Sequence, residues 1–177
     1  VIQPWREARD WCAERQLPCF CDATQAGGRL PLQGVGACTF AAGSAHKFGG
    51  PRGVGFLKAP SDSPLTPLLS GGKQQDGRRA GTENVAGVLA MLAALEACER
   101  LQAGAGETSR RASRESFERQ LLEALPGTRI NGAGATRLWN TVSVILPEAD
   151  CRQRWVVKLD KAGFAVSTGS ACASGAE

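Results

Sequence analysis

Aromatic residues and strong charge are scarce in this sequence of 177 residues. It has no tyrosine, only 6% aromatic residues, and a formal net charge of +4 from 21 basic and 17 acidic residues. Nucleic-acid-binding proteins commonly combine clustered basic residues with aromatic side chains that stack on bases. The one arginine-rich stretch, residues 110–119, also carries glutamates and is typical of a solvated helix face. We therefore expect no nucleic-acid partner.

Long apolar runs are absent as well. The best candidate, residues 85–95, is bounded by Glu83 and Glu96 and is shorter than the roughly 18 residues that a membrane-spanning helix needs. The first residues lack the apolar core and small-residue cleavage site of a secretory signal. We expect no membrane segment and no membrane partner. The missing initiator methionine favours a segment of a longer chain.

Paired metal ligands are also missing. The seven cysteines are an odd number without a C-x-x-C pair, and there is a single histidine. Zinc sites and secreted disulfide frameworks need paired or regularly spaced ligands, so we expect no metal site and reduced thiols in the cytoplasm. The cysteines are Cys12, Cys19, Cys21, Cys38, Cys98, Cys151 and Cys172.

Helical and strand-like segments alternate over the first hundred residues. Apolar residues at helical spacing predict a helix over residues 5–15, and a long helix is predicted over 82–101, with Thr82 as N-cap and Gly104 as its end. Short apolar runs between such helices predict buried strands, which indicates an α/β sheet. The predicted strands cover residues 17–21, 38–42 and 54–57.

The composition changes after the Gly-Ala-Gly segment at residues 104–106. Beyond it, helical and strand-like patterns predict a smaller α+β unit. We therefore divide the chain into a large domain, residues 1–103, and a small domain, residues 104–177. The predicted elements of the small domain are helices over 109–125 and 150–162 and strands over 128–131, 139–146 and 164–167.

The only histidine, His46, stands immediately before one of five lysines, Lys47. Lys47 follows a predicted strand and precedes a glycine-rich turn, where an α/β sheet usually presents its ligand site. A lysine amine there can form a Schiff base with pyridoxal phosphate (PLP), which also needs a carboxylate and phosphate donors. Asp22 ends the preceding strand, and Ser44 precedes His46. A solvated loop is the ordinary interpretation of such a lysine, and the residue types alone leave both readings open.

Four segments resemble the cysteine desulfurases of the class V aminotransferase group in order and spacing. They are CDATQAGGRLPL, SAHKFGGPRGVGF, GGKQQDGRRAGTENVAG and STGSACASG. The resemblance covers nearly the whole chain, and the last segment separates this family from most other PLP enzymes. It implies part of the fold type I large domain, with a mainly parallel sheet, followed by a smaller α+β domain. Its cysteine loop resembles desulfurases of general or nitrogenase-linked iron–sulfur assembly.

The resemblance also implies roles for single residues. Lys47 would carry PLP and act as the base at the substrate α-carbon. Asp22 would pair with the pyridine nitrogen, and Gln25 would hydrogen-bond the phenolic oxygen. The phosphate would be bound by Ser44 and His46 and, from the partner subunit of a homodimer, by Thr82.

Cys172 would be the nucleophile that takes sulfur from L-cysteine. The products would be L-alanine and a persulfide on Cys172, whose sulfur passes to an acceptor or scaffold protein. Small residues on both sides of Cys172 suit a mobile, exposed loop, independently of the resemblance. We expect the other six cysteines to be inert core or surface thiols.

This chain differs in length from members of the cysteine desulfurase family. Family members are roughly twice as long, and their ring-stacking histidine and substrate-carboxylate arginine have no counterpart here. We therefore expect the intact parent protein to be a cysteine desulfurase and this segment alone to be inactive. The alternatives are another class V PLP enzyme, such as a selenocysteine lyase or an aminotransferase, and an inactive truncated fragment.

Overall fold

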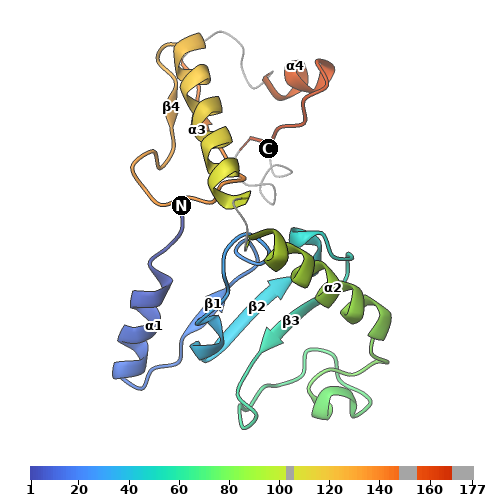
Figure 1. Ribbon diagram of the computed structural model, residues 1–177. Coiled ribbons are helices and arrows are strands. Elements are labelled where there is room, and N and C mark those ends of the chain that lie inside the picture. The colour runs from blue at the N-terminus through green and yellow to red at the C-terminus, as the bar shows by residue number, and fades with distance from the viewer. Residues whose placement is uncertain (103–105, 148–154, 169–177) are drawn as a thin grey trace. The chain divides into compact units, whose positions relative to one another are not determined.

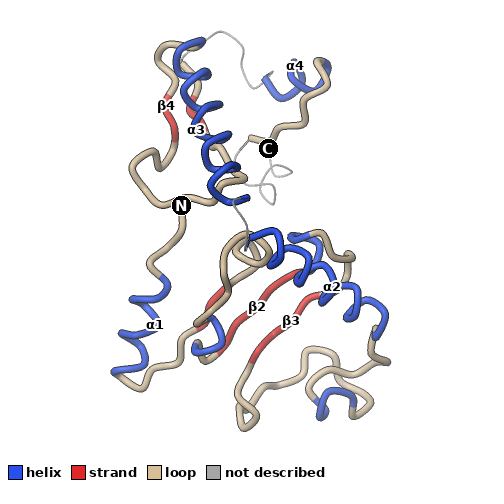
Figure 2. The backbone as a smooth tube through the Cα atoms, in the orientation of Figure 1, coloured by secondary structure: helices blue, strands red, loops and turns tan. Residues whose placement is uncertain are grey.

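The computed structural model describes residues 1–102, 106–147 and 155–168 (Figures 1 and 2). The chain divides into two compact units, which are treated separately below. One comprises residues 1–117 and 132–142, and the other comprises residues 118–131 and 143–177. Our division into functional domains at residue 104 stays a prediction. Among the described residues, no helix is both long and apolar enough to cross a membrane.

A three-stranded mixed sheet forms the centre of the first unit (Figure 2). Strands β1 (Phe20–Asp22) and β2 (Phe40–Ser44) are parallel, whereas β3 (Gly55–Lys58) runs antiparallel to β2. The α/β class is confirmed. The expected parallel pairing is seen between β1 and β2, while the segment between β2 and β3 is shorter than the dozen or so residues that a parallel crossover needs.

Helix α1 (Trp5–Glu14) precedes the sheet and none of its residues is buried. Its Trp5 packs against a small buried cluster of Ala23, Val35 and Ala41. The first predicted strand was expected to be buried, and this is wrong for Phe20, which is 59% exposed. The reason is that β1 is an edge strand of this sheet, and Phe20 stands on the opposite face from its half-buried neighbour Cys21.

Helix α2 (Val85–Gln102) supplies the other buried cluster of the first unit. Met91 packs with Ala45, Phe48 and Val54, which belong to the segment between β2 and β3. The predicted cap was wrong: Asn84, not Thr82, accepts a hydrogen bond from the Gly87 N–H at 3.0 Å. Gly104, the predicted helix end, lies outside the described residues.

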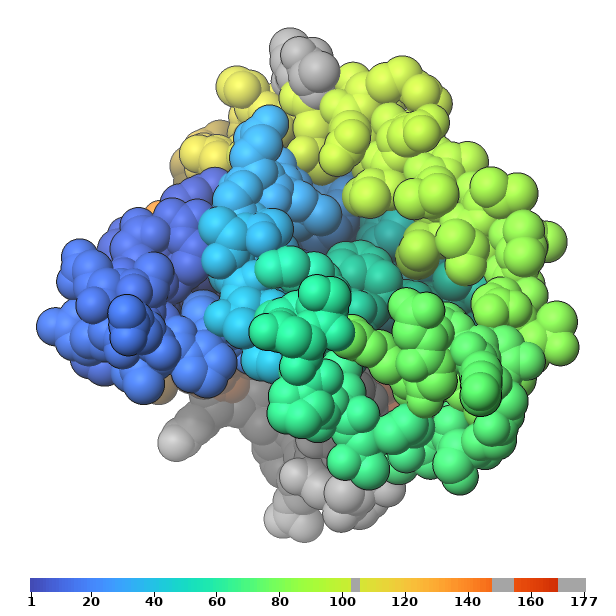
Figure 3. Space-filling model, turned by 90° about the horizontal axis from the view of Figure 1, so that it is seen from below, coloured from blue at the N-terminus to red at the C-terminus, as the bar shows by residue number. Residues whose placement is uncertain are grey.

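Three short 3-10 turns are also seen among the described residues of the first unit. They are η1 (Val35–Ala37), η2 (Ala45–Phe48) and η3 (Gln74–Gly77). η2 directly follows β2 and contains both His46 and Lys47. The long connection over residues 59–84, which holds η3, lies on the surface in green (Figure 3), and Leu68 within it is 97% exposed.

Helix α3 (Gly106–Ala124) begins in the first unit and ends in the second. The second unit contains the antiparallel pair β4 (Arg129–Ile130) and β5 (Val144–Ile145), and helix α4 (Trp155–Lys161). The strand predicted over 139–146 is thus confined to β5. The strand predicted over 164–167 is wrong: this segment pairs with no strand among the described residues, and a ladder needs a partner.

Candidate active site

Asp22 lies at the carboxyl end of β1, where its carboxylate is exposed. The N–H of Thr24 donates to Asp22 Oδ1 at 2.9 Å, which closes a local turn after the strand. Hydrogen bonds from the Thr24 side chain and then its backbone lower the pKa of the Asp22 carboxyl, against a smaller opposing effect of burial. Asp22 is therefore a stable anion at neutral pH.

Ser44 lies at the carboxyl end of the adjacent strand, β2. Because β1 and β2 are parallel, Asp22 and Ser44 belong to the same edge of the sheet. Ser44 Oγ is 2.8 Å from Nδ1 of His46, the second residue of η2. When Nδ1 accepts this hydrogen bond, the neutral ring carries its proton on Nε2. In this arrangement the Ser44 hydroxyl proton is used on Nδ1, and the Nε2–H of His46 is the donor that the pair offers to an anion.

Lys47 is half-buried, and the backbone around it is held by side chains from elsewhere in the chain. Arg29 Nη2 donates to the Lys47 carbonyl oxygen at 2.6 Å, and Cys98 Sγ donates to the Phe48 carbonyl oxygen at 3.3 Å. The Gly50 N–H closes the turn on the Ala45 carbonyl oxygen at 2.9 Å. These bonds fix two consecutive backbone carbonyls, those of Lys47 and Phe48.

Two glycines allow the segment after β1 to approach η2 closely. A Cβ added to Gly28 would lie 2.5 Å from Phe48 Cβ, and Gly28 also has a positive φ of 70°. At Gly27, an added Cβ would be 3.1 Å from the Phe48 ring. Only glycine fits both the conformation and the space at residue 28.

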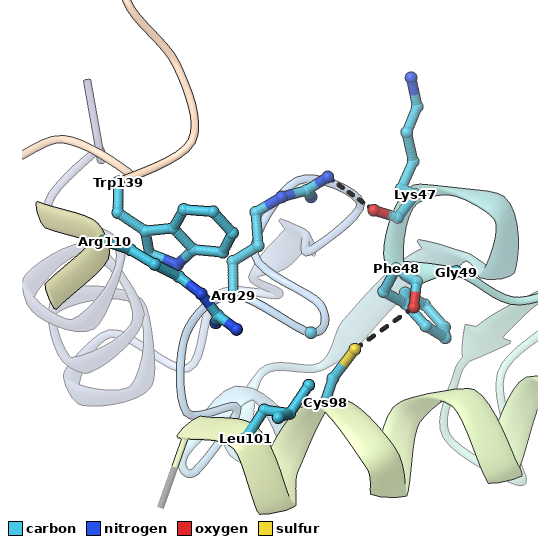
Figure 4. Close-up of a pocket in the computed structure, with 9 residues that line it drawn as sticks. Arg29, Lys47, Phe48, Gly49, Cys98, Leu101, Arg110 and Trp139 are labelled. Carbon is cyan, nitrogen blue, oxygen red and sulfur yellow. Dashed lines mark hydrogen bonds between the residues drawn. The ribbon is translucent and has the colours of Figure 1, made fainter. Parts of the chain in front are cut away.

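A cavity of about 240 Å³ lies beside η2. Figure 4 shows that the Lys47 side chain points away from this cavity, while the Lys47 carbonyl faces Arg29. The amine of Lys47 is therefore on the other side of η2. The cavity is lined by Gly28, Arg29, Lys47, Phe48, Gly49, Cys98, Leu101, Arg110 and Trp139.

The remaining predicted site residues are less closely connected. Gln25 is exposed, and Arg29 Nη1 donates to its carbonyl oxygen at 2.9 Å, so one guanidinium joins Gln25 to Lys47. Thr82 is exposed and lies three residues before α2. The structure thus brings Ser44, His46 and Lys47 together, with Asp22 at the same sheet edge. Cys172 lies outside the described residues.

Arg29 and Cys98 support the site but were missed by the sequence analysis. Arg29 follows Gln25 by four residues, which is a spacing that places side chains on one side of a helical turn. Its link to Lys47 spans 18 residues and Cys98 reaches Phe48 across 50, so no local pattern reports either contact.

The sequence matches the family model described as Aminotransferase class-V over residues 1–176. The chain belongs to the class-V aminotransferase family. Among curated members, it is 41% identical over 156 residues to a cysteine desulfurase of Cereibacter sphaeroides, which covers 88% of this chain and 39% of the relative. It is 36% identical over 176 residues to a cysteine desulfurase of Klebsiella pneumoniae, with coverage of 99% and 44%.

The fold agrees with the family. A NifS-like protein from Rickettsia africae matches with a TM-score of 0.83 at 26% identity, covering 96% of this chain and 47% of that structure. The expected fold, part of a PLP-dependent transferase of fold type I, is therefore confirmed. This class-V chain spans about two fifths of the length of the curated relatives it matches.

The chemistry of the site residues suits the PLP that the motif resemblance implies. PLP presents an aldehyde, a basic ring nitrogen and a phosphate, which call for an amine, an anion and donors. Lys47 supplies the amine, the ionised Asp22 supplies the anion, and the Ser44–His46 pair supplies a donor for the phosphate. Residues present in this class-V chain therefore fit the cofactor.

Proposed function

We propose that this chain is part of a PLP-dependent cysteine desulfurase that works in the cytoplasm on L-cysteine. The observation that carries the proposal is the arrangement of Lys47, Ser44 and His46 at one sheet edge with an ionised Asp22. The class-V family and the cysteine desulfurase relatives support it. When bound, PLP withdraws electrons from the substrate α-carbon and so makes its proton acidic.

Each residue at this edge has a role of its own in the proposal. Lys47 Nζ holds the cofactor covalently and, once L-cysteine replaces it there, takes the α-proton of the substrate. The Asp22 carboxylate stabilises the protonated ring nitrogen, and Ser44 and His46 together bind the phosphate. Gln25 donates to the phenolic oxygen of the ring.

Cys172 is proposed as the sulfur acceptor. Its thiolate forms a bond to the sulfur of the substrate, the carbon–sulfur bond of the substrate breaks, and the carbon product gains protons to leave as L-alanine. The sulfur remains as a persulfide on Cys172 and passes on to an acceptor protein. Thr82 is proposed to bind the phosphate of the second subunit in a homodimer.

Covalent trapping in the full-length protein tests the attachment site. After incubation with PLP and reduction with borohydride, we expect the pyridoxyl group on the peptide that carries Lys47. Lys47→Ala should lose this label, while the control Lys161→Ala, which changes an exposed lysine of α4, should keep it. A label spread over several lysines would contradict the assignment.

A second variant tests sulfur transfer independently of cofactor attachment. Cys172→Ser in the full-length protein should keep the Lys47 label and lose the persulfide formed from L-cysteine, measured by mass spectrometry of the intact protein. Sulfur transfer by Cys172→Ser at the normal rate would refute the role of Cys172. Release of selenide from L-selenocysteine without any alanine formed from L-cysteine would favour a selenocysteine lyase instead.

A further inference from the structure

The wall of the cavity beside η2 combines positive charge with apolar surface. All of its lining residues belong to the first unit, and no aspartate or glutamate of the described chain is among them. Its basic side chains are those of Arg29 and Arg110, because the side chain of Lys47 points away from it (Figure 4). The cavity therefore holds two cations and no anion. Its apolar surface comes from Phe48, Leu101 and Trp139.

Arg110 is the first residue of the arginine-rich stretch that the sequence predicts as a solvated helix face, yet it is half-buried. Its guanidinium carbon lies 4.7 Å from the centroid of the Trp139 ring, and stacking of this kind orients a guanidinium without using its N–H donors. The nearby carboxylate of Glu107 on α3 is paired with Arg111 instead, at 2.9 Å. Among the described residues, Arg110 has no ion-pair partner.

Arg29 also keeps donors for a ligand. Its Nη1 donates to the Gln25 carbonyl oxygen at 2.9 Å and its Nη2 to the Lys47 carbonyl oxygen at 2.6 Å, and a guanidinium has more N–H groups than these two bonds use. Burial lowers the pKa of the Arg29 guanidinium, against a smaller opposing effect of Cys98. Its charge is thus partly desolvated, and within the described chain no carboxylate pairs with it.

Trp139 adds another donor to the wall of the cavity. Its indole Nε1 is buried, and no acceptor in the described part of the chain lies within hydrogen-bond distance of it. Buried polar groups are normally paired, so a donor of this kind calls for an explanation. Donors outnumber acceptors around this cavity, which suits a ligand that brings acceptors and negative charge.

We propose that the cavity beside η2 is a binding site for a small organic carboxylate. Arg110 and Arg29 bind the carboxylate, whose shape matches the planar fork of a guanidinium. The rest of the ligand packs against the apolar part of the wall, and this apolar surface favours an organic acid over inorganic phosphate. The site is separate from the proposed cofactor site, because the Lys47 amine lies on the other side of η2 (Figure 4).

Benzoate is the probe for this site, because it joins a carboxylate to a flat apolar ring. Its binding to the full-length protein is followed by NMR through the indole N–H resonance of Trp139, which Trp139→Phe identifies. Inorganic phosphate and benzyl alcohol, which offer only the charge and only the ring, are titrated at the same salt concentration. We expect benzoate to shift this resonance and the other two to bind about tenfold more weakly.

The same titration is repeated with saturating PLP, which should leave the affinity for benzoate unchanged. Because this experiment measures binding and no turnover, it can succeed or fail independently of the proposed function.

Two matched variants of α3 test the role of the charge. Arg110→Gln keeps most of the side-chain stem on the Trp139 ring and removes the charge, so we expect it to weaken benzoate binding about tenfold. Arg111→Gln removes a charge from the next position, which does not line the cavity, and should bind benzoate like the parent protein. Arg110→Lys keeps the charge without the planar fork and should recover part of the affinity. Circular dichroism checks that each variant folds.

Three results would overturn the carboxylate site: no shift of the Trp139 resonance with benzoate, equal affinities of Arg110→Gln and Arg111→Gln, or displacement of benzoate by PLP. Phosphate binding as tight as that of benzoate would overturn the assignment to an organic acid and indicate a site for inorganic anions.

Discussion

The two sides of η2 are built differently. On one side its backbone is tied down: the carbonyls of Lys47 and Phe48 accept hydrogen bonds from Arg29 and Cys98, and the Phe48 side chain is buried. On the other side, the imidazole of His46 is exposed and the Lys47 side chain points away from the cavity (Figure 4). One side thus provides support, and the other presents reactive groups.

Because of this difference, substitutions at neighbouring positions should affect either the stability of the fold or the chemistry of the site. Substitutions on the supporting side should lower the free energy of unfolding, because they remove packing or leave buried carbonyls without donors. Substitutions of the reactive groups, which make no contact with the buried cluster, should leave stability within about 0.5 kcal/mol and change only cofactor binding. A variant that did both would show that the two sides are coupled.

The largest effect is expected at Gly28. In Gly28→Ala, the new Cβ meets Phe48 Cβ at 2.5 Å in a left-handed conformation, so we expect a loss of about 3 kcal/mol in the free energy of unfolding. Gly49→Ala is the matched control, since its φ of 88° is also positive but an added Cβ has no neighbour within 4 Å. It should cost only about 1 kcal/mol. If urea denaturation gave the same loss of unfolding free energy for Gly28→Ala and Gly49→Ala, close packing against Phe48 would not be the cause of the effect.

A substitution of Arg29 tests its hydrogen bond to the Lys47 carbonyl oxygen. Arg29→Ala leaves a carbonyl without its charged donor, and we expect a loss of about 2 kcal/mol by urea denaturation of the full-length protein. The pyridoxyl label on Lys47 should also form more slowly, because the turn that carries the amine is less fixed. The exposed Arg52 offers a control, and Arg52→Ala should match the parent protein in both measurements. An unchanged stability in Arg29→Ala would show that the supporting side does not depend on this bond.

Sequence reasoning identified the reactive side better than the supporting side. Lys47 and His46 were found because their rare residue types stand beside glycines, and the helices and strands around them follow short-range apolar patterns. Arg29 and Cys98 act over 18 and 50 residues of chain. The cap at Asn84 was also missed, because several polar residues precede α2 and only the geometry shows which one accepts the Gly87 N–H. Contacts of this kind arise from packing and leave no local pattern.

A smaller effect is expected on the reactive side. Ser44→Ala removes the hydroxyl that is 2.8 Å from His46 Nδ1, and with it one part of the proposed phosphate site. We expect PLP to bind about tenfold more weakly, which corresponds to about 1.4 kcal/mol, while the urea midpoint stays unchanged. Ser44→Thr keeps a hydroxyl and should restore part of the affinity. A lower urea midpoint in Ser44→Ala would place Ser44 on the supporting side instead.

The smallest expected effect concerns the acidity of Asp22. Hydrogen bonds from Thr24 lower the pKa of this carboxyl in the folded protein, so they stabilise the fold above the ordinary aspartate pKa of about 3.9, and this contribution is lost as the pH falls through the lowered value. Thr24→Val removes the hydroxyl and keeps the backbone N–H at 2.9 Å. The pKa of Asp22 should rise part of the way to its ordinary value, as measured by NMR titration of its carboxyl carbon. Stability at neutral pH should fall only slightly, because the carboxylate is exposed, and this difference from the parent protein should vanish as the pH falls below the lowered pKa. A titration identical to that of the parent protein would mean that the backbone N–H alone holds Asp22 in its anionic form.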